Sequence, residues 1–286
     1  MNDAKQPLAI VTGASRGLGR RIVIELAAKG VNVLAVGRDY AALSETVTQG
    51  MDIGLGAIHP VVCDLEHPDA VEIIVTVANE RGGADILVNN AAIQGPIGLS
   101  WETDAAAFEQ TLRVNFLVPV ALSHAVLPSM IARGAGWIVN LSGGGATGPR
   151  PMFAAYGAAK AALVRFGETL AAEVVAKGVR VNSVAPGAFA SGMTQKILKH
   201  GTEAGKLEKN NAENMLARDD QANAVKAAKL IAYLIVGAGR DVTGRLISAA
   251  WDPWTELHLH WESIRDSDAY TLRRIVPADR QRKREA

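Results

Sequence analysis

The sequence predicts an α/β protein of the doubly wound type, in which helices cover both faces of a seven-stranded parallel sheet. Short runs rich in valine and isoleucine alternate along the chain with longer stretches of helical pattern. Apolar and polar residues scarcely alternate within these runs, which is typical of strands buried on both faces. A glycine-rich turn, TGASRGLG (12–19), joins the first run to the first helical stretch. These features favour a single doubly wound domain.

The predicted elements follow a regular order. Strands are expected at LAIVTG (8–13), VNVLAVG (31–37), AIHPVVCD (57–64), ADILVNN (84–90), GWIVNLS (136–142), VRVNSVAP (179–186) and GRLISA (244–249). Helices are expected between them, near residues 17–29, 39–49, 67–80, 104–132, 153–177 and 219–236. We find no internal repeat and no linker rich in proline, glycine or serine. The domain is therefore expected to span residues 1–250, with a C-terminal extension at 251–286.

One long connection, residues 188–218, separates the sixth strand from the last long helix. It contains many charged and small residues. Connections of this length more often form a functional lid or binding loop than an idle segment. We expect such a role here.

Composition and charge exclude several classes of protein. Nearly half of the 286 residues are apolar, and 30 basic residues face 29 acidic ones. A net charge near zero argues against nucleic-acid or anionic-membrane partners. The N-terminus lacks the apolar core of a signal peptide, and we find no apolar run of the ~18 residues that a membrane span needs. Cys63 is the only cysteine, so a reducing, cytoplasmic location is expected.

The glycine turn predicts a nucleotide-diphosphate site. Gly13, Gly17 and Gly19 allow the backbone to approach a diphosphate, and the following helix offers unpaired N–H groups and a favourable dipole. Glycine-rich turns can also serve only to pack a strand against a helix. GASRG lacks the lysine followed by serine or threonine of an ATP-binding loop, so we expect a dinucleotide.

The end of the second strand bears on the choice of cofactor. An NAD site usually has a carboxylate there for the 2′-hydroxyl of the adenosine ribose. This chain has Gly37 and Arg38 instead, with Arg16 in the glycine turn. Two guanidinium groups suit a 2′-phosphate. NADP(H) is therefore favoured, while NAD(H) stays possible because Asp39 could supply the carboxylate and the arginines could be solvated surface groups.

A tyrosine and a lysine mark the expected reaction centre. Tyr156 and Lys160 are four residues apart, so on a helix they share one face. A free tyrosine has a pKa of ~10, and a neighbouring ammonium or oxidised nicotinamide ring favours the phenolate. Lowering that pKa toward 7 requires ~4 kcal/mol of differential stabilisation. The spacing alone arises by chance in many helices, so its position after the fifth strand gives it weight.

Taken together, these motifs resemble the short-chain dehydrogenase/reductase family of the short-subunit type. The resemblance runs from about residue 7 to 249 and is carried by TGASRGLG, CDL, NNAA, RVNF, IVNLS, YGAAK and the PG pair at 186–187. It implies a seven-stranded Rossmann fold, a nicotinamide cofactor and the interconversion of an alcohol and a carbonyl compound. By this resemblance Tyr156 is the proton donor and acceptor, Lys160 holds the nicotinamide ribose and lowers the pKa of the tyrosine, and Asn115 belongs to a water-linked proton relay.

The same resemblance, with the glycine turn, assigns the cofactor contacts. Asp64 is expected at the adenine edge, NNAA at the ribose, and Ser191 at the carboxamide, where the family normally has threonine. The complete expected set is Gly13, Ser15, Arg16, Gly17, Leu18, Gly19, Arg38, Asp64, Leu65, Asn90, Ala91, Tyr156, Lys160, Pro186, Gly187 and Ser191.

The substrate-orienting serine of the family is displaced in this chain. The family has it thirteen residues before the tyrosine, and that position here is Gly143, whereas Ser142 stands fourteen before. A shift of one residue normally turns a strand side chain to the other face. The glycine run after Ser142 could permit a local shift. We expect Ser142 to take the role, with loss of that hydrogen bond as the alternative, and we expect a roomy pocket mouth.

Pro119 lies four residues after Asn115 in a helical stretch. Because proline has no N–H, the Asn115 carbonyl receives no helical hydrogen bond from it. This carbonyl could hold a water of the proton relay, or the proline could merely kink the helix.

Three other features are given no catalytic role. His258 and His260 lack a clear third metal ligand, so no metal is expected. Cys63 is interpreted as a small core residue. The basic end, RQRKREA, is expected to be a solvated tail.

The tail from residue 251 is too apolar for a disordered segment, and WDPWTELHLHW fits no single amphipathic helix. Members of the resembled family commonly form dimers and tetramers, and tryptophans often anchor interfaces. We expect a homo-oligomer, most simply a tetramer, in which this tail packs across an interface; folding onto its own subunit is the alternative.

The sequence as a whole predicts an NADP(H)-dependent oxidoreductase that acts on a secondary alcohol or ketone. The small-molecule substrate is left open. A nucleotide-binding regulatory or scaffold protein that has lost the chemistry is the alternative. A nucleotide-sugar epimerase would prefer another glycine spacing and a larger C-terminal domain.

Overall fold

A computed structural model describes residues 6–51, 53–218, 221–277 and 279. In this part of the chain seven strands form one parallel sheet in the order β3-β2-β1-β4-β5-β6-β7. The fold prediction is confirmed, and each strand lies within its predicted run. The strands are β1 (Leu8–Thr12), β2 (Asn32–Gly37), β3 (Ile58–Val62), β4 (Ile86–Asn89), β5 (Gly136–Leu141), β6 (Val179–Ala185) and β7 (Leu246–Ser248).

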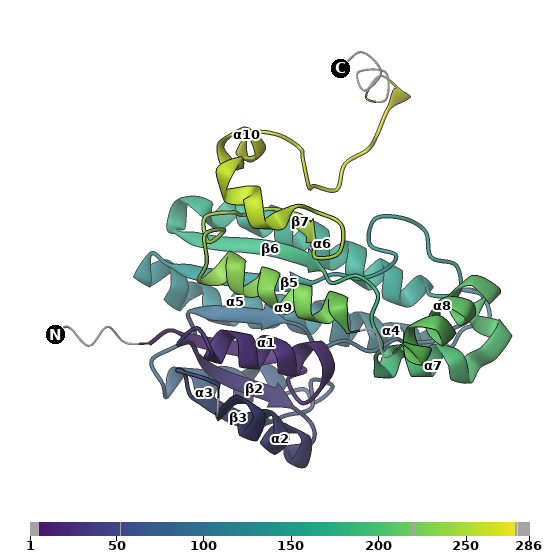
Figure 1. Ribbon diagram of the computed structural model, residues 1–286, viewed down its shortest axis with the longest axis horizontal. Coiled ribbons are helices and arrows are strands. Elements are labelled where there is room, and N and C mark those ends of the chain that lie inside the picture. Colours follow the sequence, from purple (N-terminus) through teal and green to yellow (C-terminus); the bar gives the residue numbers. More distant parts are fainter. Residues whose placement is uncertain (1–5, 52, 219–220, 278, 280–286) are drawn as a thin grey trace.

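Helices cover both faces of this sheet (Figure 1). One face carries α1 (Gly17–Ala27), α2 (Tyr40–Met51) and α9 (Ala222–Ile235); the other carries α3 (Ala70–Asn79), α5 (Val118–Arg133) and α6 (Ala154–Val174). The 3₁₀ turn η2 (Val175–Lys177) ends α6. The sheet order reverses direction between β1 and β4, which is where doubly wound folds bind their ligands.

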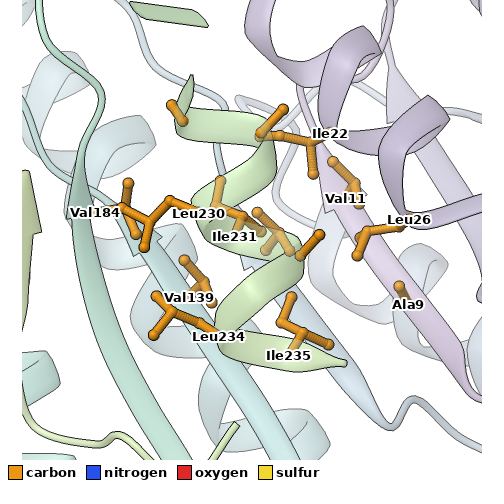
Figure 2. Close-up of a cluster of buried hydrophobic side chains, with 14 of the residues drawn as sticks. Ala9, Val11, Ile22, Leu26, Val139, Val184, Leu230, Ile231, Leu234 and Ile235 are labelled. Atoms are coloured by element: carbon orange, nitrogen blue, oxygen red, sulfur yellow. The ribbon is translucent and has the colours of Figure 1, made fainter. Parts of the chain in front are cut away.

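The two apolar cores explain why the strands show so little alternation. In β1, Ala9 and Val11 belong to the core under α1 and α9, whereas Leu8 and Ile10 belong to the opposite core. All four side chains are buried. Figure 2 shows the apolar side chains of α9 facing α1 on one side and the strands of the sheet on the other. The sheet that positions the site is thus held from both sides.

The predicted helix at 104–132 is a continuous helical stretch with a break in its hydrogen-bond pattern. It consists of α4 (Ala105–Leu112), the π-helical turn η1 (Arg113–Leu117) and α5. In η1 the Val118 N–H donates to the Arg113 carbonyl, which is the i→i+5 pattern of a π turn. Pro119 follows directly, and its missing N–H accounts for a local departure from the α-helical pattern. Such turns often occur at functional sites.

This stretch also corrects one expectation. The helical stretch Ala105–Arg133 is long and apolar enough to cross a membrane by length and composition, because an 18-residue window within it has a mean hydropathy of 1.6. The expectation that no run of that kind exists is therefore wrong. Half of the apolar window is buried inside the protein, and α5 packs against α3, β5 and α6. A core helix of a soluble protein passes the same test.

The long connection at 188–218 is largely helical. It contains α7 (Gly192–His200), the 3₁₀ turn η3 (Gly201–Ala204) and α8 (Lys206–Ala217), and α7 and α8 lie together at one side of the molecule (Figure 1). Ile197, Ala204 and Ala212 of this connection form an apolar cluster with Phe153 and Tyr156. The connection thus covers the beginning of α6.

The C-terminal extension packs on its own subunit as far as Leu272, and the described chain beyond it runs away from the body (Figure 1). It contains the 3₁₀ turn η4 (Trp254–Leu259) and the short α10 (Trp261–Arg265). Leu257 is buried in the core under α9, and Trp254 and Trp261 pack against that core. The folded-back alternative is therefore observed for these residues. Trp251 remains 86% exposed, and the basic end, RQRKREA at 280–286, lies outside the described residues.

The extension is also tied to the subunit by hydrogen bonds. The buried Arg245 guanidinium donates to the carbonyls of Ile264, Arg265 and Ser267 at 2.8–3.1 Å. The Leu272 N–H donates to Glu168 on α6 at 2.7 Å. Its path is otherwise irregular, as the sequence predicted.

Candidate active site

The glycine turn between β1 and α1 is built for close backbone approach. Gly13 and Gly17 have φ values of +68° and +56°, which favour glycine. A Cβ added at Gly19 would come within 2.0 Å of the Gly13 carbonyl oxygen, so only glycine allows the helix to begin so near the turn. The space beside Gly17 is open. Leu18 is buried and anchors α1 in the core. The turn therefore fits a diphosphate at the helix N-terminus.

The end of β4 holds this turn in place. The Asn90 side-chain amide donates to the Thr12 carbonyl at 2.9 Å and to the Gly13 carbonyl at 3.3 Å. The backbone N–H groups of Asn90 and Ala91 both donate to the Thr12 hydroxyl at 3.0 Å. In this structure Asn90 therefore fixes the shape of the glycine turn, a contact that the motif alone does not predict.

The expected adenosine end brings Arg38 and Asp64 together. The Arg38 guanidinium lies 3.6 Å from the Asp64 carboxylate and 4.0 Å from that of Glu66, and all three side chains are at least one-third exposed. Gly37 allows close contact, because a Cβ there would lie 3.3 Å from Ser15 Cβ. Leu65, between the two acids, is buried. A cation thus borders this end of the site.

Asp39 and Arg16 do not belong to the charged cluster around Arg38. The Asp39 carboxylate accepts from the Ala42 N–H at 3.1 Å and caps the start of α2. The Arg16 guanidinium lies near Gly192 of α7, since a Cβ there would be 3.5 Å from Arg16 Nη2. The two expected arginines therefore make different contacts: Arg38 with acids after β3, and Arg16 with the start of α7.

The opposite side of the site follows β6. Gly187, after Pro186, has φ +80°, and a Cβ there would lie within 3.0 Å of Ala250 and Asn223 atoms. The Asn223 amide donates to the Ala188 carbonyl at 2.8 Å. The Ser191 hydroxyl accepts from the Thr194 N–H at 3.2 Å and so caps α7. Ser191 is thus the residue at which the covering helix begins.

Tyr156 and Lys160 lie on α6 and are both buried. The Lys160 ammonium lies 5.8 Å from the centre of the Tyr156 ring and donates to the Leu141 carbonyl at 2.7 Å. Burial lowers the pKa of Lys160 to about 8. Burial raises the pKa of Tyr156, and the Arg150 guanidinium opposes that rise. Arg150 is therefore a second cation beside the phenol, in addition to the expected Lys160.

The glycine run before α6 faces the phenol. A Cβ added at Gly143 would come within 2.4 Å of Tyr156 Oη, so the phenol oxygen occupies the space that a side chain at 143 would need. Ser142 is buried next to it, and its hydroxyl has no hydrogen-bond partner among the described residues. Ser142 is the neighbour of Gly143 in the sequence, but its hydroxyl does not form a hydrogen bond with the Tyr156 phenol here.

Asn115 connects the π turn to the loop after β4. It is fully buried, and its amide forms two hydrogen bonds with the Ile93 backbone, one in each direction, both at 2.8 Å. Both side-chain groups are thereby engaged. Asn115 fixes the loop that follows NNAA, and any role in a proton relay falls to its backbone carbonyl.

Sequence reasoning missed Arg150 and Glu208 near this centre, and the buried Gln94 in the loop after β4. Arg150 lies 5.9 Å from the centre of the Tyr156 ring and forms a two-point ion pair with Glu208 of α8. A single arginine between two prolines, and a glutamate 58 residues away in a connection without a motif, give no joint signal. Gln94 is buried with an unpartnered Oε1 within the described chain. Nothing in its sequence context marks it.

The residues set aside in the sequence have other contacts. The His258 ring lies 3.0 Å from the Tyr233 hydroxyl. Within the described ranges, no group of three or more His, Cys, Asp or Glu side chains is arranged to hold a metal. Cys63 is buried, and that burial raises the pKa of its thiol. None of these groups borders the phenol.

Comparison with known proteins agrees with this architecture. The short chain dehydrogenase family model matches residues 7–201. A short chain dehydrogenase of Pseudocercospora fijiensis is 34% identical over 249 residues, covering 85% of this chain and 80% of that protein.

Two solved structures extend the comparison. A variant of actinorhodin polyketide ketoreductase with NADPH has a TM-score of 0.75 at 27% identity, covering 85% of this chain and 95% of that one. An NAD⁺-bound xylitol dehydrogenase has a TM-score of 0.74 at 25% identity, covering 85% and 96%. This chain belongs to the short-chain dehydrogenase/reductase family and is an NAD(P)-dependent oxidoreductase acting on CH–OH groups.

Proposed function

We propose that this protein interconverts a secondary alcohol and a ketone with NADP(H), and that Tyr156 is the general acid and base. The observation that carries the proposal is the buried pair of Tyr156 and Lys160, whose phenol faces the glycine run at Gly143. A phenol and an ammonium in a site shielded from water are suited to proton transfer to or from an alcohol oxygen. A dinucleotide could extend from the glycine turn to this pair of residues.

The residues present fit such a dinucleotide. The glycine turn would hold its diphosphate, and Arg38, Asp64 and Leu65 would border the adenosine. Lys160 would bind the nicotinamide ribose, because its ammonium has three donors and the Leu141 carbonyl takes one. Ser191 and the Pro186–Gly187 turn would border the carboxamide. When bound, the cofactor supplies or accepts a hydride.

The chain's own groups then handle the proton. Tyr156 would donate its proton to the oxygen of a ketone, or accept one from an alcohol. Lys160 would favour the phenolate by its charge. Ser142 would orient the substrate oxygen through its unpartnered hydroxyl. Asn115 would hold the loop after β4 and offer its carbonyl to a relay water.

The preference for NADP(H) rests on the charges at the adenosine end. Arg38 follows Gly37, where NAD sites usually have a carboxylate. Asp39 caps α2, which argues against a role for it at a ribose 2′-hydroxyl. Arg38 is shared with two acids at 3.6 and 4.0 Å, and a 2′-phosphate would compete with them. NAD(H) is the other candidate cofactor.

The test is a substrate panel of sugars, polyols, acyl thioesters, and steroid and terpenoid ketones. Turnover is followed by the absorbance of the reduced nicotinamide. We expect turnover of at least one ketone or secondary alcohol, faster with the phosphorylated cofactor, and loss of it in Tyr156→Phe. Tyr40→Phe is the matched control, because Tyr40 is 65% exposed on α2.

The missing serine at position 143 favours one competing function, a nucleotide-binding regulator without chemistry. Cofactor binding with no turnover across the panel would support that alternative and contradict the enzyme proposal.

A homo-oligomer, dimer or tetramer, in the cytoplasm is also proposed. Trp251 and Leu259 remain 86% and 68% exposed although the extension folds back, which supports burial against a second copy. Trp251→Ser with Leu259→Ser should reduce the mass in solution, whereas Trp254→Ala should lower only the free energy of unfolding. An unchanged mass for the double variant would contradict the interface. The single, buried Cys63 supports a reducing compartment, and cell fractionation tests it.

A further inference from the structure

Arg150 is held against the reaction centre by the loop between β5 and α6. Its guanidinium carbon lies 4.0 Å from the centre of the Phe153 ring and 5.9 Å from that of Tyr156. A Cβ added at Gly144 would meet Arg150 Cδ and Nη1 at 3.5 Å, so the arginine stem lies over the glycine run. The side chain is only 19% exposed. A poorly solvated cation is thus fixed near the phenol.

Glu208 of α8 meets this cation from the covering connection. Its two carboxylate oxygens accept from Arg150 Nε and Nη2, each at 2.8 Å, which is the two-point geometry of a strong charge-assisted pair. Glu208 is 28% exposed. The ion pair therefore joins α8 to the loop that borders the phenol.

Few other charges approach the Tyr156 ring in the described part of the chain. From α6, Lys160 lies 5.8 Å from the ring centre. From α7, Ile197 contributes apolar contact, and the Lys196 ammonium is directed to the Gly95 carbonyl at 3.4 Å. From the loop after β4, Ala92 and Ile97 pack on the cluster. Arg150 and Glu208 are thus the charged groups that the loop and α8 contribute.

These two charges act on the phenol with opposite sign. A cation this close to the ring stabilises the phenolate over the neutral phenol. Burial raises the pKa of Tyr156, and Arg150 is the charge that opposes this. The Glu208 carboxylate, bound to the same guanidinium, weakens that opposition.

Resting on the acid–base role proposed for Tyr156, we infer that Arg150 and Glu208 are an opposed pair of positioning residues that sets the acid strength of the phenol. Arg150 makes Tyr156 the stronger acid, and Glu208 moderates the effect when α8 is docked. Neither residue exchanges a proton with the substrate; both act through Tyr156.

The experiment measures the ionisation of Tyr156 in the full chain without turnover. Phenolate absorbance is titrated in each protein, and the Tyr156→Phe titration is subtracted. Arg150→Met should decrease the acid ionisation constant about tenfold, whereas Glu208→Gln should increase it several-fold. Arg150→Lys, which keeps the charge, should restore most of the loss. Lys229→Met, at an exposed position on α9, is the matched control and should change nothing.

The pH profile of kcat/KM for alcohol oxidation should follow the same order. Shifts in the same direction for Arg150→Met and Glu208→Gln, or no shift in either, would overturn the inference. Loss of folding cannot imitate two shifts of opposite sign. If the titrations shift as expected while no substrate is turned over, the pair stands and the proposed function fails.

Discussion

The phenol oxygen of Tyr156 lies over Gly143, so near that a Cβ at residue 143 would come within 2.4 Å of it. The position where the family has its substrate-orienting serine is therefore not simply vacant. Tyr156 extends into it, while Ser142 stands beside it, buried and without a partner in the described structure. The glycine is thus part of how this chain seats its phenol.

Gly143→Ala should lower kcat about tenfold or more, because the added methyl group must push the phenol out of its position. Cofactor affinity should change little, since the glycine turn is untouched. Gly148→Ala is the matched control, because a Cβ there meets nothing within 4 Å. Full activity in Gly143→Ala would show that the phenol does not react from this position.

Ser142→Ala should cost ten-fold or more in kcat/KM, on the order of 1.4 kcal/mol or above. Because the Ser142 hydroxyl has no partner in the described structure, its removal should not lower the melting temperature. Steady-state kinetics and thermal unfolding of one preparation separate the two effects. An unaffected kcat/KM would assign polarisation of the carbonyl to another donor or a water.

Arg38→Ala should remove most of a preference for NADPH over NADH while changing NADH affinity little. The guanidinium would pair with the 2′-phosphate, which NADH lacks, and a charge-assisted pair of this kind contributes about 1.5–3 kcal/mol. Titration calorimetry with both cofactors measures it, with Arg21→Ala on α1 as the control. Equal affinities in the unmodified protein would refute the role given to the arginines.

Lys160 should make stability depend on pH. Burial lowers the pKa of its ammonium from 10.5 to about 8. Below about pH 8 both the folded and unfolded states are protonated, and the folded state carries the full cost of the buried charge. Between about 8 and 10.5 the unfolded state binds more protons, so this group makes the free energy of unfolding rise with pH.

Urea unfolding at several pH values checks this, with Lys160→Met as the comparison and Lys229→Met as the control. Relative to Lys160→Met, the unmodified protein and the control should gain stability across that window. Parallel pH curves for all three proteins would mean that Lys160 is not desolvated.

The fold could be predicted because each strand has a recognisable local pattern of apolar residues. In β1 every residue is apolar or small, since α1 and α9 cover one face and the opposite helices the other. Local spacing in the sequence also made it possible to predict the glycine turn and the pair of Tyr156 and Lys160. Contacts that depend on a distant partner could not be predicted in this way. Asn90 bonds the glycine turn, and Arg150 pairs with Glu208, across separations that no short motif encodes.

The covering connection and the extension were only partly predictable. Helix α7 begins at Ser191, a capping residue followed by apolar Met193 and Ile197 four residues apart, so its start was present in the sequence. Which face it covers depends on Phe153 and Tyr156. The fold-back of the extension depends on Arg245, buried under three carbonyls of α10 and the turn after it. A charged residue directly before a short strand gives no sign of such partners.

The measurement that tests the central claim most directly is turnover and cofactor binding by Tyr156→Phe, which removes one oxygen atom from the centre of the site. We predict that turnover is abolished while the affinity for NADPH stays nearly intact, and that Tyr40→Phe behaves as the unmodified protein. Retention of more than a few per cent of the activity would contradict the account, because the proton would then come from another group.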